Sequence, residues 1–183
     1  LLLVLFIASC SPADTKVDIS KVFRYNEHAN ITSLDPAFAK DQRNIWPCHQ
    51  LYNTLIKLDE NLNTQPDLAR SWDISDDGLT YTFKLKENIL FHPHKCFNDQ
   101  SERILQADDV VFSLNRLRRK ELASPGAWVM NNVDTIKAID SQTVEIRLKK
   151  RFPAFLGLLS MKFCSIIPTE VQKCNINLRN DPV

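Results

Sequence analysis

The segment 66–85, PDLARSWDISDDGLTYTFKL, constrains the fold of this chain more than any other stretch of similar length. The cluster Ser75–Gly78 is typical of a turn between two strands, and Gly78 can adopt the positive φ that such turns often need. After the turn, apolar and polar residues alternate, which is the pattern of a strand with one buried face. The segment therefore predicts a β-hairpin that packs one face against a core.

Other segments predict further strands and helices, so the expected fold class is α/β in the mixed α+β sense. We place the first helix start near Trp46, because Pro47 suits a first turn better than a helix interior. The expected helices cover about 46–55, 107–118 and 153–159, and the expected strands cover 22–25, 55–58, 133–139, 143–148 and 163–167. Residues 30–36 are expected to form a loop.

Composition excludes some classes of function. The chain has 23 basic and 22 acidic residues, and a formal net charge of +1 argues against an electrostatic nucleic-acid interface. It has three glycines and no phosphate-binding GxGxxG or GxxxxGK[ST] string, which disfavours a nucleotide-hydrolysing subunit. The basic run 118–120 is interpreted as a solvated helix end, because the helix dipole favours cations there.

The N-terminal residues indicate export from the cytoplasm. Residues 1–8 are wholly apolar and are followed by Ser9 and Cys10, as in a secretory signal. The run is too short to cross a bilayer, which needs about 20 residues. No Met or basic segment precedes Leu1, so we expect the natural leader to begin before it.

Beyond Cys10 the chain has four cysteines, at positions 48, 96, 164 and 174. Four cysteines allow three pairings, and the sequence does not choose among them. Disulfides are compatible with an oxidising compartment. Cys48 and Cys164 have apolar neighbours, so an alternative for both is a role as small hydrophobic core residues.

Two clusters could suggest metal or thiol chemistry. His92, His94 and Cys96 alternate, and a strand would place them on one face, as a metal site could require. Their spacing is not that of a zinc finger and no fourth ligand is evident, so we predict no metal site. Cys48 and His49 are adjacent on a helix and cannot face each other, which disfavours an activated thiol.

Other candidate catalytic groups have structural interpretations. The pairs Asp76–Asp77 and Asp108–Asp109 occur where turns and helix N-termini favour Asp. Ser113 and Ser160 lie outside any GxSxG context, so a hydrolase nucleophile has no support. We therefore expect no enzyme activity, no catalytic residue and no cofactor.

Several blocks, in order between about residues 21 and 168, resemble the extracellular solute-binding proteins, family 5, of ABC importers, the dipeptide- and oligopeptide-binding group. The blocks are Leu34–Ala37, Leu51–Leu55, the hairpin 66–85, Phe91–His92, Ala107–Leu114, Val144–Leu148 and Phe152–Leu156. The sequence departs from the family pattern at two places. Pro93–Cys96 stands where the family usually has a short Asp-Gly turn, and the chain stops before the family's GTGPF segment.

The resemblance implies a periplasmic-binding-protein type II-like fold, in which two lobes close like a hinge on a ligand. It also implies a division of the chain: a signal peptide at 1–9, a lipidated tether at 10–16, the start of the first lobe at 17–46, an accessory subdomain at 47–163, and a truncated return into that lobe at 164–183. The second lobe and hinge would follow Val183. We therefore expect weak or no peptide binding by residues 10–183 alone.

The resemblance further implies a ligand-contacting loop after the first strand, at residues 27–34, where we nominate His28, Asn30, Ile31 and Thr32. Ile7–Cys10 looks like a lipobox, with Cys10 as the lipidated residue and membrane anchor. The implied partners are a peptide, bound largely through its main chain, and the permease and ATPase subunits of an importer. Alternatives are another solute (nickel, haem or a sugar oligomer), or a surface lipoprotein with an enzymatic or scaffold role. The implied location is the periplasmic or extracellular face of the cell envelope, as a membrane-anchored lipoprotein.

Overall fold

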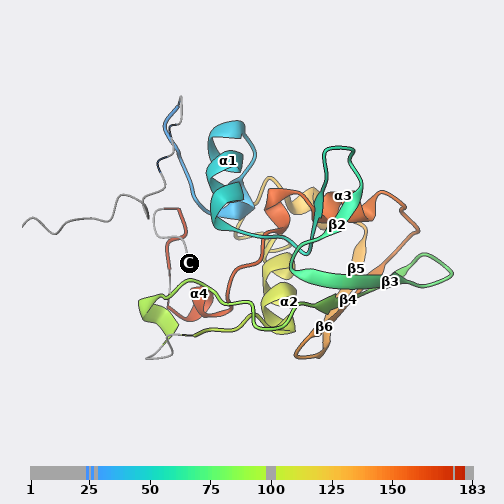
Figure 1. Ribbon diagram of the computed structural model, residues 1–183. Helices are drawn as coiled ribbons and strands as arrows, with labels where there is room; N and C mark the ends of the chain where they lie inside the picture. Colours follow the sequence, from blue (N-terminus) through green and yellow to red (C-terminus); the bar gives the residue numbers. More distant parts are fainter. Residues whose placement is uncertain (1–23, 25, 27–28, 98–101, 175, 180–183) are drawn as a thin grey trace, which may run out of the picture.

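The computed structural model describes residues 24, 26, 29–97, 102–174 and 176–179. A four-stranded antiparallel sheet with the order β3-β4-β6-β5 forms its largest layer (Figure 1). The strands are β3 Ala69–Ile74, β4 Thr80–Leu85, β5 Val133–Asp140 and β6 Thr143–Leu148. A separate two-stranded ribbon, β1 Ile56–Leu58 and β2 Thr64–Pro66, precedes them. The mixed α/β class expected from the sequence is confirmed.

The hairpin predicted at 66–85 is present as β3 and β4. Trp72 pairs with Phe83 across the two strands, and Gly78 in the connecting turn has a φ of 68°. Tyr81 and Phe83 are buried, as the alternation of the sequence predicts. The second predicted hairpin is also present, as β5 and β6.

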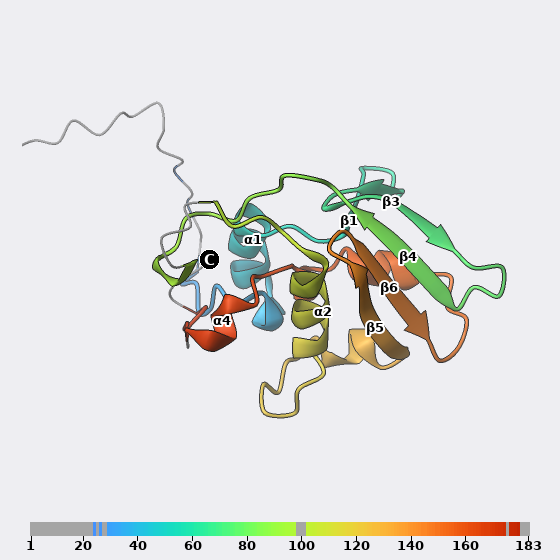
Figure 2. The same ribbon diagram turned by 90° about the horizontal axis from the view of Figure 1, so that it is seen from below.

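Helix α2, Ala107–Arg116, covers the sheet and ends two residues before the predicted boundary. Figure 2 shows it between the sheet on one side and α1 and α4 on the other. Val110 and Leu114 of α2 are fully buried in the same cluster as Val144 and Ile146 of β6. This cluster is the main hydrophobic core.

A second, smaller cluster lies away from the sheet, around α1 Gln42–Leu51 and α4 Glu170–Lys173. Its buried members are Ala39, Cys48, Tyr52, Phe97, Ile167, Val171 and Leu178. The remaining helical elements are α3 Phe155–Leu159 and the 3-10 turns η2 Pro36–Phe38, η3 Lys95–Phe97, η4 Ala127–Met130 and η5 Lys162–Cys164. The described residues thus form two cores: α2 packs beside the sheet in the first, and residues of α1 and α4 contribute to the second (Figure 2).

The predicted start of the first helix is wrong. Helix α1 begins at Gln42, and Pro47 lies inside it. The first turn is held by the Asn44 side chain, which is 3% exposed and accepts hydrogen bonds from the loop at Thr32 and Ser33. Because Pro47 removes one backbone donor, this tertiary anchoring and the burial of the proline ring offset the cost.

The predicted strand at 163–167 is also wrong, although the segment is buried. Its first residues form η5, and the next ones are extended without joining a sheet. The Ile167 N–H donates to the Ser113 hydroxyl at 2.9 Å and the Ile166 N–H to the Asn53 carbonyl at 2.9 Å, in place of a strand ladder. An apolar run of this length does not by itself distinguish a strand from other buried backbone.

Helix α1 also ends four residues before its expected boundary, at Leu51, whereas the other boundaries differ by about two residues. The loop before Pro36 and the strand ending at Leu58 are present, and the helix expected from Pro153 begins at Phe155. The strand predicted at 22–25 falls largely outside the described residues, as do the signal at 1–9 and the tether at 10–16 with Cys10. In the part of the chain that the structure describes, no helix combines the length and hydrophobicity that a membrane span requires.

Candidate functional site

The loop proposed for ligand contact covers residues 27–34, of which the structure describes 29–34, and it leads into η2. Asn30, Ile31 and Thr32 are all exposed on it, and 42% of the Ile31 surface is accessible. His28, the fourth nominated residue, lies outside the described residues. The loop therefore presents an amide and an aliphatic side chain next to each other on the surface.

The inner side of this loop is fixed by Asn44 of α1. The Asn44 Oδ1 atom accepts hydrogen bonds from the Thr32 N–H at 3.1 Å and the Ser33 N–H at 3.3 Å. The Asn44 amide also donates to the Thr32 hydroxyl at 2.9 Å. Thr32 is thus the nominated residue whose side chain holds the loop in place. The sequence pattern does not single out Asn44, because its role depends on contacts between distant parts of the chain.

A second anchor joins the end of the loop to α2. Arg116 donates from Nη1 and Nη2 to the two carboxylate oxygens of Asp35, at 2.8 and 2.6 Å. The Asp35 side chain is 6% exposed, and it also accepts from the Ala37 N–H at 3.0 Å to begin η2. Paired, planar geometry of this kind fixes orientation as well as distance.

Two further contacts hold Leu34. Its N–H donates to the Arg179 carbonyl at 3.0 Å, and the Cys48 thiol lies 3.5 Å from the Leu34 carbonyl oxygen. Burial, followed by the nearby Asp35 carboxylate, raises the pKa of Cys48 to about 12. Cys48 is therefore a protonated core residue, while its neighbour His49 is exposed. The pair does not form an activated thiol.

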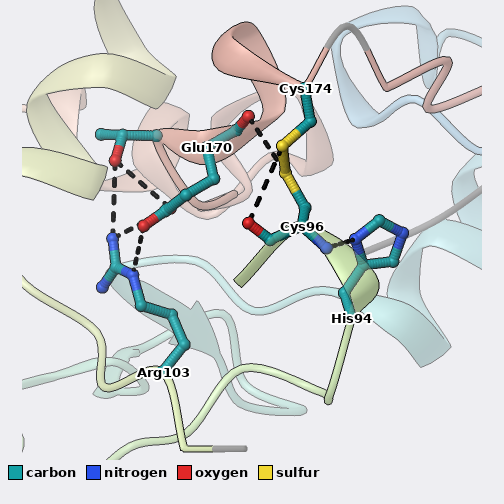
Figure 3. The surroundings of a disulfide bond; sticks show 6 residues. His94, Cys96, Arg103, Glu170 and Cys174 are labelled. Atoms are coloured by element: carbon teal, nitrogen blue, oxygen red, sulfur yellow. Dashed lines mark hydrogen bonds and ion pairs between the residues drawn. A yellow bond between two sulfur atoms is a disulfide. The ribbon is translucent and has the colours of Figure 1, made fainter. Parts of the chain in front are cut away.

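A disulfide joins Cys96 of η3 to Cys174 at the end of α4, 78 residues later (Figure 3). Cys48 and Cys164 are free and buried, so these two residues serve as small hydrophobic core residues. His94 turns its Nδ1 atom toward the backbone and accepts from the Cys96 N–H at 3.1 Å. Because Cys96 is bonded to another sulfur, the cluster considered for a metal loses its only thiolate.

An ion network lies beside the disulfide (Figure 3). Arg103 donates to Glu170 at 2.8 Å and to Asp109 at 2.7 Å, and its side chain is 13% exposed. Burial raises the pKa of Glu170, but the hydrogen bond and charge of Arg103, with hydrogen bonds from the Glu170 N–H and Thr169, together outweigh burial, and the net pKa is lowered. Asp109 is fully buried, and burial raises its pKa against the opposing hydrogen bonds. The network and the disulfide together hold the segment after β4 to α4.

Asp77, Ser113 and Ser160, which were also considered as candidate catalytic groups, each have a hydrogen-bond partner within four residues of the chain. Asp77 accepts from the Ser75 hydroxyl at 2.6 Å and the Leu79 N–H at 2.9 Å, which closes the hairpin turn. The Ser113 hydroxyl donates to the Asp109 carbonyl at 2.7 Å, and the Ser160 hydroxyl donates to the Gly157 carbonyl at 2.8 Å. These groups stabilise turns and helix ends.

Comparison with known proteins connects this arrangement to a family. Residues 63–181 match the family described as bacterial extracellular solute-binding proteins, family 5 Middle. The Escherichia coli glutathione-binding protein GsiB is 32% identical over 97% of this chain and 32% of its own length. The Haemophilus influenzae haem-binding protein A is 37% identical over 66% of this chain and 24% of its own length.

A solved structure of a periplasmic binding protein also resembles this chain. The periplasmic binding protein DppA from Helicobacter pylori, in complex with the peptide STSA, superimposes with a TM-score of 0.71 and 31% sequence identity. The match covers 82% of this chain and 32% of DppA. The chain thus spans about a third or less of the length of the proteins it matches.

Proposed function

Because the chain belongs to the bacterial extracellular solute-binding proteins of family 5, we propose that it is part of a receptor that captures peptides outside the cytoplasm. The fold is that of the type II periplasmic binding proteins, of which it covers one part. The observation that carries the proposal is the superposition on a peptide-bound receptor at a TM-score of 0.71. The captured peptide would be delivered to the permease and ATPase subunits of an ABC importer.

The loop 29–34 is the proposed contact surface of this part of the receptor. Asn30 and Ile31 are exposed, while Asn44 holds the loop from behind through Thr32. A loop that is already fixed loses little conformational freedom when a ligand binds, which favours affinity. His28 and Thr32 belong to the same proposed surface, and an extended peptide would meet it through main-chain hydrogen bonds.

The anchor and the division of the chain are further parts of the proposal. Cys10 would carry the lipid after removal of 1–9, and residues 10–16 would form the tether. Residues 17–46 and 164–183 would belong to the first lobe and 47–163 to the accessory subdomain. Metabolic labelling with radioactive palmitate tests the anchor: wild type takes up label and fractionates with membranes, whereas Cys10→Ala does neither.

A second candidate is a receptor of the same family for another solute. The observation that favours it is the 37% identity to a protein named for haem binding. Nickel and a sugar oligomer remain further alternatives within this candidate. Because the proteins compared bind different solutes by name, membership of the family does not fix the ligand.

Calorimetric titration of the full-length protein separates these candidates. We expect saturable binding of unblocked peptides of three to five residues. Ile31→Ala should bind them about tenfold more weakly, since losing aliphatic surface that a bound ligand would cover costs about 1–2 kcal/mol. Ile139→Ala, which alters an equally hydrophobic residue that is 57% exposed at the end of β5, serves as the matched control. Binding of haem or nickel without any peptide binding would contradict the proposal.

A further inference from the structure

A basic hollow of about 520 Å³ lies between α1, β1 and the segment 160–163. Its polar lining comes mainly from Lys40, His49, Lys57 and Lys162. Its apolar lining comes from Ala39, Ile45, Leu58, Met161 and Phe163. Among the described residues that line it, none carries a carboxylate, and no residue of the loop 29–34 takes part. The hollow is therefore a separate feature with an excess of positive charge.

Lys162 is the least exposed of the three lysines. Its ammonium group donates to the Tyr52 carbonyl oxygen at 3.4 Å, which is a long hydrogen bond for a charged donor. An ammonium group has three protons to donate, so this bond occupies one of them and leaves two for other acceptors. Burial lowers the pKa of Lys162, although the Asp67 carboxylate acts in the opposite direction.

The Asp67 carboxylate is already engaged elsewhere. It accepts hydrogen bonds from the Asn53 side chain at 3.0 Å and from the Thr54 N–H at 3.1 Å. It therefore compensates the Lys162 charge only in part. A ligand anion in the hollow would supply the missing compensation, because charge-assisted hydrogen bonds are strongest where water is partly excluded.

His49 and the apolar lining residues indicate which other chemical groups a ligand of the hollow would carry. Partial burial, followed by the charge of Lys162, lowers the pKa of His49, which favours the neutral imidazole with one N–H to donate. Leu58 is 37% exposed, and the flexible Met161 side chain also lines the hollow. These side chains offer apolar surface next to the amino groups.

We propose that this hollow binds an organic carboxylate with an apolar body, with Lys162, Lys40 and Lys57 around the carboxylate and Leu58 and Met161 against the body. The C-terminal residue of a peptide has this chemistry when its side chain is apolar, and so does a free organic acid. If the peptide is the source, the hollow contributes to the capture proposed above. The binding itself does not depend on that function.

Methyl NMR of the full-length protein with ¹³C-labelled methionine tests the proposal at the hollow itself. The Met161 signal is assigned by its loss in Met161→Leu, and Met130, which is 2% exposed in the main core, is the internal reference. We expect N-acetyl-leucine to shift the Met161 signal saturably and to leave Met130 unchanged. N-acetyl-leucinamide, which has the same body without the charge, should leave both signals unchanged.

Lysine-to-glutamine variants test whether binding depends on the positive charge of the hollow. Lys162→Gln should weaken binding of N-acetyl-leucine about tenfold or more, as expected for loss of a charge-assisted hydrogen bond. Lys57→Gln, at an exposed position with little risk to folding, should weaken it less, and the exposed Lys137→Gln on β5 should not change it. Competition by the tripeptide Ala-Ala-Leu identifies a peptide as the source, and lack of competition identifies a free acid.

Three results would overturn the proposal: no shift of Met161 up to about 10 mM probe, equal shifts with the acid and its amide, or unchanged binding in both lysine variants. These outcomes are distinct from failure of the proposed peptide capture. Calorimetry reports on the whole receptor, whereas the Met161 signal reports on this hollow alone.

Discussion

Arg116, in the last turn of α2, donates to both carboxylate oxygens of Asp35, 81 residues earlier in the chain, at 2.8 and 2.6 Å. Asp35 directly follows the loop 29–34, which is also held by Asn44. The position of the proposed contact loop therefore depends on a helix that packs against the sheet. The ion pair thus links the end of the loop to α2.

Arg116→Ala should lower the free energy of unfolding by about 3–5 kcal/mol, because it leaves the Asp35 carboxylate buried without its cation. Arg116→Lys should lose less, since a single ammonium can replace the charge but not the paired geometry. Urea denaturation of the full-length protein measures both changes. The control is Arg118→Ala, at an exposed position next to α2, with an expected change within about 0.5 kcal/mol. Equal stability of the Arg116 and Arg118 variants would show that the ion pair contributes nothing.

The Cys96–Cys174 disulfide should contribute substantially to stability because it closes a loop of 78 residues. The double variant Cys96→Ala/Cys174→Ala should lose about 2–5 kcal/mol of unfolding free energy. Wild type in a reducing buffer should denature at the same urea concentration as the variant. A non-reduced protease digest should contain the linked peptide, and its absence from the mass spectrum would contradict the pairing.

Cys48 and Cys164 should resist thiol reagents while the protein is folded. Burial raises the pKa of both thiols to about 12, so the reactive thiolate is scarce at pH 8. In a Cys10→Ala form of the full-length protein, DTNB should modify neither residue before unfolding and both after it in urea. Rapid modification of the native protein at either position, located by peptide mapping, would mean that this region opens readily.

Three turn aspartates should make the protein sensitive to acid. The pKa of Asp59 is lowered mainly by the Asn63 N–H, that of Asp77 by the Ser75 hydroxyl, and that of Asp140 by the Gln142 N–H. A folded pKa below the unfolded value of about 3.9 gives stability that is fully present above that value. This stability is lost as the pH falls through the lower folded pKa. Buried Asp109 has a raised pKa, so its contribution to stability changes with pH in the opposite direction.

Thermal midpoints measured between pH 5 and pH 2 test this expectation. Replacing the three turn aspartates by Asn should make the midpoint fall less steeply with decreasing pH, because the titrating groups are gone while an acceptor oxygen remains. The exposed Asp108→Asn serves as the matched control. If the thermal midpoint of the triple variant fell with pH as steeply as that of wild type, the three aspartates would not be the source of the acid sensitivity.

The two hairpins and α2 could be predicted because their signals are local. Alternation around Tyr81 and Phe83 identifies a half-buried strand, and acidic residues at one end of 107–116 with basic residues at the other identify a helix. The start of α1 could not be predicted, because it depends on Asn44 contacting Thr32. The apolar run ending at Ile167 was misassigned because its backbone partners come from distant segments.

The contacts that hold the candidate loop could not be predicted from local sequence patterns either. Asp35 occurs within a recognisable block of the sequence, but no local pattern pairs it with Arg116, 81 residues later. The choice of Cys96 and Cys174 among three pairings likewise required three-dimensional proximity. The exposed residues Asn30 and Ile31 came from the resemblance to the family, and their contact with a ligand stays a prediction.

Native mass spectrometry of the full-length protein, purified without added ligand, tests the central claim most directly. The account predicts one bound peptide, or a distribution of peptides, at a ratio of one per protein, released on denaturation and identified by sequencing. Haem, nickel or another non-peptide solute in place of peptides would contradict it.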